Sequence, residues 1–419
     1  MKVVILGGGF GGVYTAQNLK SCWPLGEKLD VTLISRSSHF EFKPLFPEVF
    51  AGRLSPDHVR FRLHDLCRAC HVKIAQITGI DPRKNVVKTD KGDVKYEYLV
   101  IALGGQPESV PVTQGAELSF FESLDDAVRL RDRVAALARQ MRSGRTKSRA
   151  RNSVVIIGAG PTGIEIASEA SYLLGTNRDK PAAASKRPRA DIYLIEFAPQ
   201  ILHAWGQALR DETRRILGEA GVHLLTSTRV SRIERGRVYL NGERSISADA
   251  VVWAGGLRGL PLYQSLGSPL DRYGRFRVNA RLQLPRHENV FAMGDAINTA
   301  GFPMPIPQSA QAAFQQAHCV AANVRRSIAG KALKEFRYSE LGVAMPVGGR
   351  RAVAHIGGLP IEGHVAWALE KALFTARVPG LANKLKLFDG LALEPLEQEG
   401  MRYLKEKGIE WEFLRENAE

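Results

Sequence analysis

The sequence predicts an α/β fold in which one nucleotide-binding architecture occurs twice. Apolar runs at residues 3–6 and 154–157 each have the composition of a buried parallel strand. Each run leads directly into a glycine-rich turn and then into a helical stretch. A second strand follows in each unit, at residues 31–34 and 192–195. Because strand, turn, helix and strand recur in this order, the sequence predicts two Rossmann-like dinucleotide-binding domains.

The later apolar runs also match between the two halves. A buried strand is expected at residues 98–103 and another at residues 250–253, and each is followed by a pair of glycines. Between them, a helix with a charged face is expected from about residue 124 to 141. The first helices of the two units are expected to end near Lys20 and Leu174.

The 419 residues carry a net charge of +15, and this excess of cations needs an explanation. Nucleic acid, an anionic membrane surface and nucleotide cofactors are the candidate partners. No aromatic residues interleave with the basic clusters, which argues against single-strand binding, so no nucleic-acid partner is expected. The clusters are best interpreted as solvated loops. They consist of Arg139, Arg142, Arg145, Lys147, Arg149 and Arg151, and of Arg178, Lys180, Lys186, Arg187 and Arg189.

The four cysteines, Cys22, Cys67, Cys70 and Cys319, do not form the spacing of a disulfide framework, which predicts a reducing compartment. The chain contains neither a signal-peptide pattern nor an apolar run of about 18 residues, so no transmembrane helix is expected. The histidines lack the spacing of metal ligands, so no metal site is expected.

The two glycine turns both have the spacing G-x-G-x-x-G between a strand and a helix. The first glycine makes the tight turn, the second lets the backbone approach a pyrophosphate, and the third lets helix and strand pack closely. The amino end of the helix adds positive potential for the phosphates. The six glycines are Gly7, Gly9, Gly12, Gly158, Gly160 and Gly163.

The residue that ends the second strand of each unit is expected to recognise the adenosine ribose. In the second unit it is Glu196, a carboxylate that accepts hydrogen bonds from ribose hydroxyls and repels a 2′-phosphate, which predicts NADH rather than NADPH. In the first unit the same place holds Ser35 and Arg36. Glu196 lies 38 positions after Gly158, so we expect a basic surface insertion between helix and strand, from about residue 177 to 190.

Asp295 follows an apolar strand that starts near Val290. A carboxylate between a strand end and a helix amino terminus can bind a flavin ribityl hydroxyl, and the helix dipole beyond it can stabilise a reduced flavin ring. The sequence therefore makes a flavin dinucleotide a candidate ligand of the first unit. The alternative for Asp295 is a turn or capping residue.

Several motifs in this order resemble the pyridine nucleotide–disulfide oxidoreductase superfamily. Two further segments, residues 39–45 with 52–54 and residues 310–317, make the chain look more narrowly like type II NADH:quinone oxidoreductases. The second of these segments is similar to that family's Ala-Gln-x-Ala-x-Gln quinone motif, with Phe314 and Ala317 as departures. The motifs of the broader resemblance are residues 7–12, 98–104, 158–165, 252–256 and 292–296.

The resemblance implies an FAD-dependent enzyme that takes a hydride from NADH and passes two electrons to a membrane quinone without pumping protons. It implies a peripheral protein on the cytoplasmic face of the inner (cell) membrane, and it leaves a homodimer open. The implied division is an FAD-binding domain over 1–120 and 285–335, interrupted by an NADH-binding domain over 121–284. A C-terminal module over 336–419 would attach to the membrane surface.

The resemblance also implies roles for single residues. Gln311 and Gln315 would lie near the flavin ring and the quinone head, and Glu165 near the nicotinamide or in a proton path. Glu169 is a rival for that role, because one helix face carries both positions. The cofactor-binding residues expected are Gly7, Gly9, Phe10, Gly11, Gly12, Ser35, Arg36, Lys43, Pro44, Ala102, Gly104, Gly158, Gly160, Pro161, Thr162, Gly163, Glu196, Gly255, Gly294, Asp295, Ala310 and Gln311.

The C-terminal stretch from 365 to 388 has apolar positions at three-to-four spacing beside cations, as in an interfacial pair of helices. An anionic membrane surface is one interpretation, and packing on the protein's own core or on a dimer partner is the other. The residues are Val365, Trp367, Leu369, Leu373, Phe374, Leu381, Leu385 and Phe388, with Lys371, Arg377, Lys384 and Lys386.

Three other functions remain as alternatives. A disulfide oxidoreductase would use the C-x-x-C pair Cys67 and Cys70, although the pair lies well past the second strand. A sulfide:quinone oxidoreductase would need further cysteines at the flavin, and only Cys319 lies late in the chain. A redox-inert flavin or nucleotide-sensing binding protein would use the basic clusters to contact nucleic acid or an acidic partner.

Overall fold

A computed structural model describes residues 1–21, 29–108, 112, 116–142, 153–175, 190–203, 205–242, 244–304 and 306–392. Nearly all of the two basic clusters, Cys22, the predicted insertion up to residue 189 and residues 393–419 lie outside these ranges. The α/β fold predicted from the sequence is present, and no described helix is long and apolar enough to cross a membrane.

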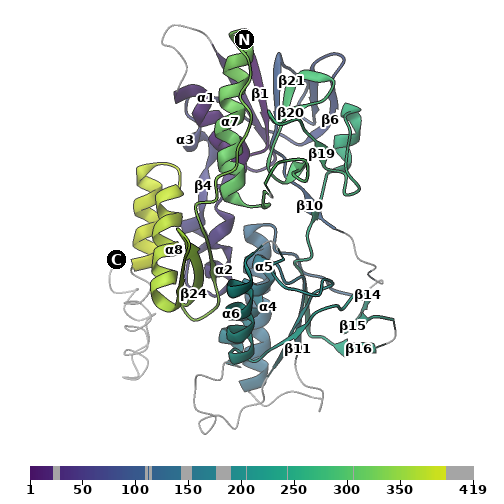
Figure 1. The fold of residues 1–419 in the computed structure, drawn as a ribbon, viewed down its shortest axis with the longest axis vertical. Coiled ribbons are helices and arrows are strands. Elements are labelled where there is room, and N and C mark those ends of the chain that lie inside the picture. Colours follow the sequence, from purple (N-terminus) through teal and green to yellow (C-terminus); the bar gives the residue numbers. More distant parts are fainter. Residues whose placement is uncertain are drawn as a thin grey trace, which may run out of the picture.

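The first predicted βαβ unit forms one side of a six-stranded sheet with the order β20-β21-β9-β1-β2-β5. Its strands pair in parallel except for the β20–β21 pair at one edge. Helices α1 (Phe10–Ser21) and α7 (Ala310–Ile328) lie side by side against this sheet (Figure 1). The strands are β1 (Lys2–Leu6), β2 (Asp30–Ser35), β5 (His71–Ile74), β9 (Tyr98–Ile101), β20 (Gln283–Leu284) and β21 (His287–Ala292).

The second unit forms a separate four-stranded parallel sheet with the order β13-β12-β11-β17, in the lower half of Figure 1. Its central strand is buried along its whole length, because Ile164 of a helix packs on one face of the sheet, and Ile233 and Val238 of a small antiparallel sheet pack on the other. The elements are β11 (Ser153–Ile157), β12 (Asp191–Ile195), β13 (Val222–Leu225), β17 (Ala250–Trp253), α4 (Leu124–Arg142), α5 (Pro161–Leu174) and α6 (Gln207–Glu219).

Short strands and helical turns complete the two halves. The pair β10–β18 lies where the chain passes between them. The small strands are β3 (His39–Glu41), β4 (Arg60–Arg62), β6 (Ile77–Asp81), β7 (Val86–Thr89), β8 (Val94–Lys95), β10 (Gln106–Pro107), β14 (Val230–Glu234), β15 (Arg237–Leu240), β16 (Arg244–Ser247), β18 (Leu257–Arg258), β19 (Phe276–Arg277) and β22 (Ile297–Asn298). The short helical turns are η1 (Lys43–Leu45), α2 (Phe46–Phe50), η2 (Pro56–Val59), α3 (Leu63–Leu66), η4 (Pro261–Leu266) and η5 (Gly294–Ala296).

The C-terminal region contains a three-stranded antiparallel sheet that the sequence analysis did not predict, formed by β23 (Val343–Pro346), β24 (Ala352–Ile356) and β25 (Leu359–Glu362). Helix α8 (Gly363–Arg377) follows directly, and residues 381–392 are helical as well. These two helices correspond to the helix pair expected over 365–388. Both lie at the outside of the molecule (Figure 1).

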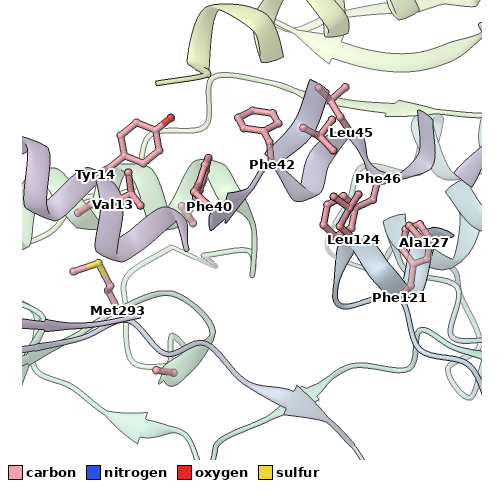
Figure 2. Packing of buried hydrophobic residues seen from close by; sticks show 14 of the residues in the cluster. Val13, Tyr14, Phe40, Phe42, Leu45, Phe46, Phe121, Leu124, Ala127 and Met293 are labelled. Atoms are coloured by element: carbon pink, nitrogen blue, oxygen red, sulfur yellow. The ribbon is translucent and has the colours of Figure 1, made fainter. Parts of the chain in front are cut away.

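Aromatic side chains pack the first half against α8 and α4 (Figure 2). Phe40 and Phe42 are buried beside Phe10 of α1, with ring centroids 5.0 and 5.2 Å from that ring. Phe42 also meets Phe374 of α8 at 6.1 Å. Such edge-to-face and tilted pairs add to the free energy gained by burial. The C-terminal helix α8 therefore packs on the segment from β3 to α2.

Candidate functional site

The first glycine turn has the geometry that its spacing predicts. Gly7 has φ +108°, and a Cβ there would overlap the Ala102 carbonyl oxygen. A Cβ at Gly12 would overlap the Gly7 carbonyl oxygen, so the helix approaches the turn as closely as a glycine permits. Nothing lies within 4 Å of a Cβ at Gly9, which leaves its backbone open to an approaching group.

The second turn repeats this geometry position by position. Gly158 has φ +105°, and a Cβ there would overlap the Ala254 carbonyl oxygen. A Cβ at Gly163 would overlap the Gly158 carbonyl oxygen, and nothing lies within 4 Å of one at Gly160. Pro161 begins α5, where its missing N–H costs no helical hydrogen bond. Both turns therefore present an open backbone segment at a helix amino terminus, which suits a pyrophosphate.

The strand-end residues differ between the two turns. Glu196 accepts hydrogen bonds from the backbone N–H groups of Ala159, at 2.7 Å, and Ala198, at 2.8 Å. The carboxylate is thus fixed beside the second turn and keeps lone pairs for a further donor. Ser35 is buried in the corresponding place beside the first turn, where its Oγ would lie 2.7 Å from a Cβ at Gly8. Arg36, the next residue, is exposed.

Asp295 lies in η5, directly after β21. Gln316 of α7 fixes this turn, because its Oε1 accepts the Gly294 N–H at 2.7 Å and its side chain is buried. Burial raises the pKa of Asp295, and the Lys43 ammonium opposes that shift. No described residue donates a hydrogen bond to the Asp295 carboxylate. Asp295 is partly exposed, so its carboxylate, which has no donor among the described residues, can accept a hydrogen bond from a ligand hydroxyl.

Other predicted cofactor residues lie around the two turns and η5. Lys43 and Pro44 form η1, where the Lys43 Nζ lies 3.1 Å from Glu122 Oε2. Gly104 has φ +71°, and its carbonyl oxygen accepts the Tyr263 hydroxyl at 2.6 Å. At the end of the second sheet, Gly255 packs under the Trp253 ring.

The two glutamines expected at the quinone end both lie on helix α7, and they differ in their hydrogen bonds. The first turn of this helix is capped by Ser309, which accepts the Ala312 N–H at 3.2 Å. The Gln311 Nε2 is buried without a hydrogen-bond partner in the described structure. The Gln315 amide instead bonds both backbone groups of Ser339, at 2.7 and 2.9 Å. Both N–H donors of the Gln311 amide are therefore free for a ligand, whereas one of the two on Gln315 is already used by Ser339.

Phe314, the bulky departure in the quinone-like motif, packs edge-on against Tyr14 of α1 with ring centroids 4.7 Å apart. Its other neighbour is the His318 ring, at 4.6 Å. The Tyr14 hydroxyl donates to the Arg377 carbonyl oxygen at the end of α8. Phe314 therefore belongs to the contact between the first sheet's helices and the C-terminal helix.

The structure also separates the two candidate glutamates of α5. Glu169 is fully buried, and both of its oxygens accept from the Arg53 guanidinium, one at 2.8 Å from Nη1. Glu165 is only partly buried and has no hydrogen-bond or ion-pair partner among the described residues. Burial raises the pKa of Glu165 to about 8. Near neutral pH, Glu165 therefore holds a proton that it can release.

Glu169 belongs to a buried ion cluster that the sequence analysis did not detect. Arg53 also bonds Glu48, with Nε to Oε2 at 2.5 Å, and the Lys371 Nζ of α8 lies 2.6 Å from Glu48 Oε1. Burial alone would raise the pKa of Glu48, yet Lys371 and Arg53 lower it to about 2. The cluster consists of Glu48, Arg53, Glu169, Glu370 and Lys371.

Charge balance assigns the proton in this cluster. Two cations face three carboxyl groups, and Glu370 keeps one oxygen without a partner. Burial raises the pKa of Glu370 to about 7 despite the neighbouring Lys371. A protonated Glu370 leaves two carboxylates against two cations, the neutral state that a buried cluster favours.

The cysteines lack the features of a redox pair. Cys67, Cys70 and Cys319 are free thiols. Burial raises the pKa of Cys67 to about 12, and that of Cys70 and Cys319 to about 11. Since the thiolate is the reactive form, these values oppose disulfide chemistry. Within the described ranges, no group of three or more His, Cys, Asp or Glu residues could hold a metal ion.

Comparison with known proteins matches residues 1–317 to the family described as pyridine nucleotide-disulphide oxidoreductase. This chain belongs to that family, which confirms the broader resemblance. Relatives named type II NADH:quinone oxidoreductases support the narrower resemblance. One from Mycobacterium tuberculosis is 29% identical, over 92% of this chain and 86% of its own. One from Staphylococcus aureus is 28% identical, over 90% and 95%.

Solved structures share the fold. NDH2 from Plasmodium falciparum in complex with NADH superposes with a TM-score of 0.79 at 18% identity, covering 94% of this chain and 97% of that one. The sulfide:quinone oxidoreductase from Aquifex aeolicus superposes with a TM-score of 0.73 at 19% identity, covering 96% and 95%. These likenesses confirm the α/β fold over the described chain.

Proposed function

We propose that this protein is an FAD-dependent oxidoreductase that takes a hydride from NADH and passes two electrons to a quinone, without pumping protons. The observation that carries the proposal is the pair of equivalent glycine turns, each open to a pyrophosphate, in one chain. Two such turns provide for two dinucleotides, which a simple dehydrogenase does not need. The names and the 90% coverage of the relatives support the donor and the acceptor.

FAD is assigned to the first turn, because the residues there fit it. The open backbone at Gly9 accommodates a pyrophosphate, and the Asp295 carboxylate without a protein donor accommodates a ribityl hydroxyl. When bound, FAD supplies a ring that accepts a hydride and returns electrons in pairs. Lys43 keeps a positive charge near Asp295, and Gln316 keeps the turn in place. Ser35 is in position to accept or donate one ribose hydrogen bond.

NADH is assigned to the second turn. The Gly160 backbone would approach the pyrophosphate, and the fixed Glu196 carboxylate would accept the two ribose hydroxyls. The same carboxylate would lie against a 2′-phosphate and repel it, which favours NADH over NADPH. Thr162 and Gly255 complete the expected contacts at the helix start and at the end of β17.

We assign Gln311 to the quinone end and Glu165 to a proton path. Gln311 has a buried amide N–H that can donate to a quinone carbonyl, and Glu165 has a proton to deliver at neutral pH. The expected place of Gln315 near the quinone head stays a prediction. Its contact with Ser339 gives it a positioning role for the segment after α7. Glu169 acts through Arg53 as part of the internal ion cluster.

Residues 1–120 with 285–335 are proposed as the FAD-binding domain, 121–284 as the NADH-binding domain and 336–419 as the membrane-attached module. Apolar side chains on the C-terminal helices face solvent, and Leu381 is 73% exposed. With neighbouring cations, this surface suits an anionic membrane, which would place the protein on the cytoplasmic face of the inner (cell) membrane. Dimer formation over the same surface is the alternative. The exposed residues are Val365, Leu373, Leu381, Leu385 and Phe388, beside Arg377, Lys384 and Lys386.

The first experiment is an anaerobic spectrum. The purified protein should be yellow, lose its colour on addition of NADH, and regain it on addition of a short-chain quinone. If NADH bleached the protein and quinone did not restore its colour, NADH would stand as the electron donor and quinone would be ruled out as the acceptor. A colourless protein that cannot be reconstituted with FAD would remove the whole proposal. Sedimentation with anionic liposomes tests the membrane surface, and full solubility at moderate salt would contradict it.

A further inference from the structure

Phe197 is an exposed aromatic residue next to the residue assigned to the NADH ribose. It directly follows Glu196, and 65% of it is exposed, an unusual placement for a phenylalanine. The Arg229 guanidinium lies over its ring, with Cζ 5.0 Å from the centroid. That guanidinium has no ion pair or hydrogen bond with any described residue. Among the described residues, no group neutralises the Arg229 charge, which lies over an exposed aromatic ring.

The two residues lie on segments that are tied together. Strands β12 and β13 are parallel neighbours, so their carboxyl ends meet at one edge of the sheet. Beyond them, the Glu196 N–H donates to the Leu225 carbonyl at 2.8 Å, and the Thr228 N–H donates back to the Glu196 carbonyl at 2.9 Å. The Ser227 N–H donates to the Ala198 carbonyl at 3.0 Å. This backbone frame fixes Phe197 and Arg229 relative to the Glu196 carboxylate.

The sheet order shows which end of a dinucleotide would reach this pair. In parallel sheets of this kind, the ligand lies outside the carboxyl ends of the strands. The second glycine turn follows the inner strand β11, Glu196 follows β12, and β13 is the outermost strand. A dinucleotide with its pyrophosphate on the turn and its ribose on Glu196 therefore continues outward, away from β17. The group that continues outward is the adenine.

We propose that Phe197 and Arg229 form the adenine-binding surface for NADH, an inference that rests on the function proposed above. The adenine ring would stack on the open face of Phe197. Arg229 lies over the opposite face of the Phe197 ring, and its cation–π interaction would keep that ring in place for stacking. Stacking of a base on an aromatic side chain is insensitive to the identity of the base. The pair therefore adds affinity for the adenosine half, and Glu196 sets the preference at the ribose.

The test compares a donor that carries adenine with one that lacks it. We expect Phe197→Ala to raise the KM for NADH about tenfold and to leave kcat unchanged, since stacking contributes only to binding. With reduced nicotinamide mononucleotide, the same variant should match the wild type. Phe197→Trp should restore the KM for NADH. Arg229→Ala should raise that KM about threefold.

The matched control is Tyr239→Ala. Tyr239 also carries an arginine over its ring, with Arg232 Cζ at 3.6 Å, but it lies on β15 and away from the strand ends. Its kinetics with both donors should equal those of the wild type. If Phe197→Ala raised the KM for both donors equally, the effect would lie in the Glu196 loop, and the adenine assignment would be overturned. An unchanged KM for NADH in Phe197→Ala would overturn it as well.

Binding of ADP-ribose, measured by calorimetry, tests the pair without turnover. Weaker binding of about tenfold in Phe197→Ala would support the adenine surface, and equal binding would overturn it. If the wild type bound ADP-ribose but failed to oxidise NADH, the proposed function would fail and the adenine assignment would stand. Binding of ADP-ribose therefore separates the two proposals.

Discussion

The two glycine turns of this chain have the same backbone and different surroundings. Gly7 and Gly158 have φ values of +108° and +105°, and their N–H groups donate to the neighbouring strand at 2.8 and 2.7 Å. In both turns, the third glycine has no room for a Cβ. The two turns therefore share one backbone conformation that suits a pyrophosphate, and the residues around each turn determine which dinucleotide binds.

The helices that follow the turns show this difference most clearly. Counted from the first glycine, Tyr14 of α1 occupies the place that Glu165 occupies in α5. Tyr14 packs in the aromatic layer and bonds the end of α8 (Figure 2). Glu165 lies beside the buried ion cluster and holds a proton. At this equivalent position, α1 therefore has a residue that packs, and α5 has a residue that can exchange a proton, although the two turns have the same geometry.

The largest effect should come from filling the third glycine of each turn. We expect Gly12→Ala to abolish flavin binding, because its Cβ would displace the Gly7 carbonyl. Gly163→Ala should keep the flavin and raise the KM for NADH more than about tenfold, a loss above about 1.4 kcal/mol. Flavin absorbance and steady-state kinetics measure the two outcomes. Gly218→Ala, in an open position of α6, is the control. A yellow Gly12→Ala protein would show that the turns are not equivalent.

The next effect separates the two glutamates of α5. Glu169→Gln should lower the free energy of unfolding by about 3–5 kcal/mol, because it leaves the single carboxylate of Glu48 to balance the buried charges of Arg53 and Lys371. Glu165→Gln should not lower it near neutral pH, since Glu165 has no partner to lose and the fold disfavours its ionised form. It should instead lower kcat with quinone by about 100-fold. Urea unfolding and quinone turnover measure these quantities. The reverse pattern would make Glu169 the functional acid.

A smaller effect is expected where the two strand ends differ. Glu196→Ala should raise the KM for NADH about tenfold, because it removes the ribose acceptor and two backbone hydrogen bonds. Ser35→Ala should weaken flavin binding about threefold, the loss of one neutral hydrogen bond. Titration of the apoprotein with FAD measures the second value. Equal losses at both positions would show that the two ribose sites work alike.

Stability should also depend on pH. The pKa of Glu165 is about 8 in the folded protein and near 4.5 without the fold. Between these values the folded state binds more protons than the unfolded state, so stability falls as pH rises through this window. Glu165→Gln should therefore lose less Tm than the wild type between pH 5 and pH 8. Parallel Tm curves for the two proteins would contradict the raised pKa.

Local sequence patterns predicted the main strands and helices well. They predicted one strand end and the small C-terminal sheet poorly. The strands at 154–157 and 250–253 and the helix from Leu124 lie where apolar periodicity placed them, within a residue or two. The strand expected at 98–103 ends at Ile101, because the chain turns there toward Gly104. The sheet β23–β25 was missed, since its strands are short and its glycines resemble those of a loop.

The sequence alone determined the duplicated turns, their order in the chain and the acid at Glu196, because these depend on short spacings and on the steric limits of glycine. Only the tertiary structure distinguished Glu165 from Glu169. Both lie on one helix face, and the choice depends on Arg53, which is 116 positions away in sequence from Glu169. For the same physical reason, the role of Gln316 was missed, and Lys371, expected among the cations of an interfacial helix pair, is instead buried in the ion cluster. A buried polar side chain is defined by its partner, and partners that meet through folding leave no local pattern in the chain.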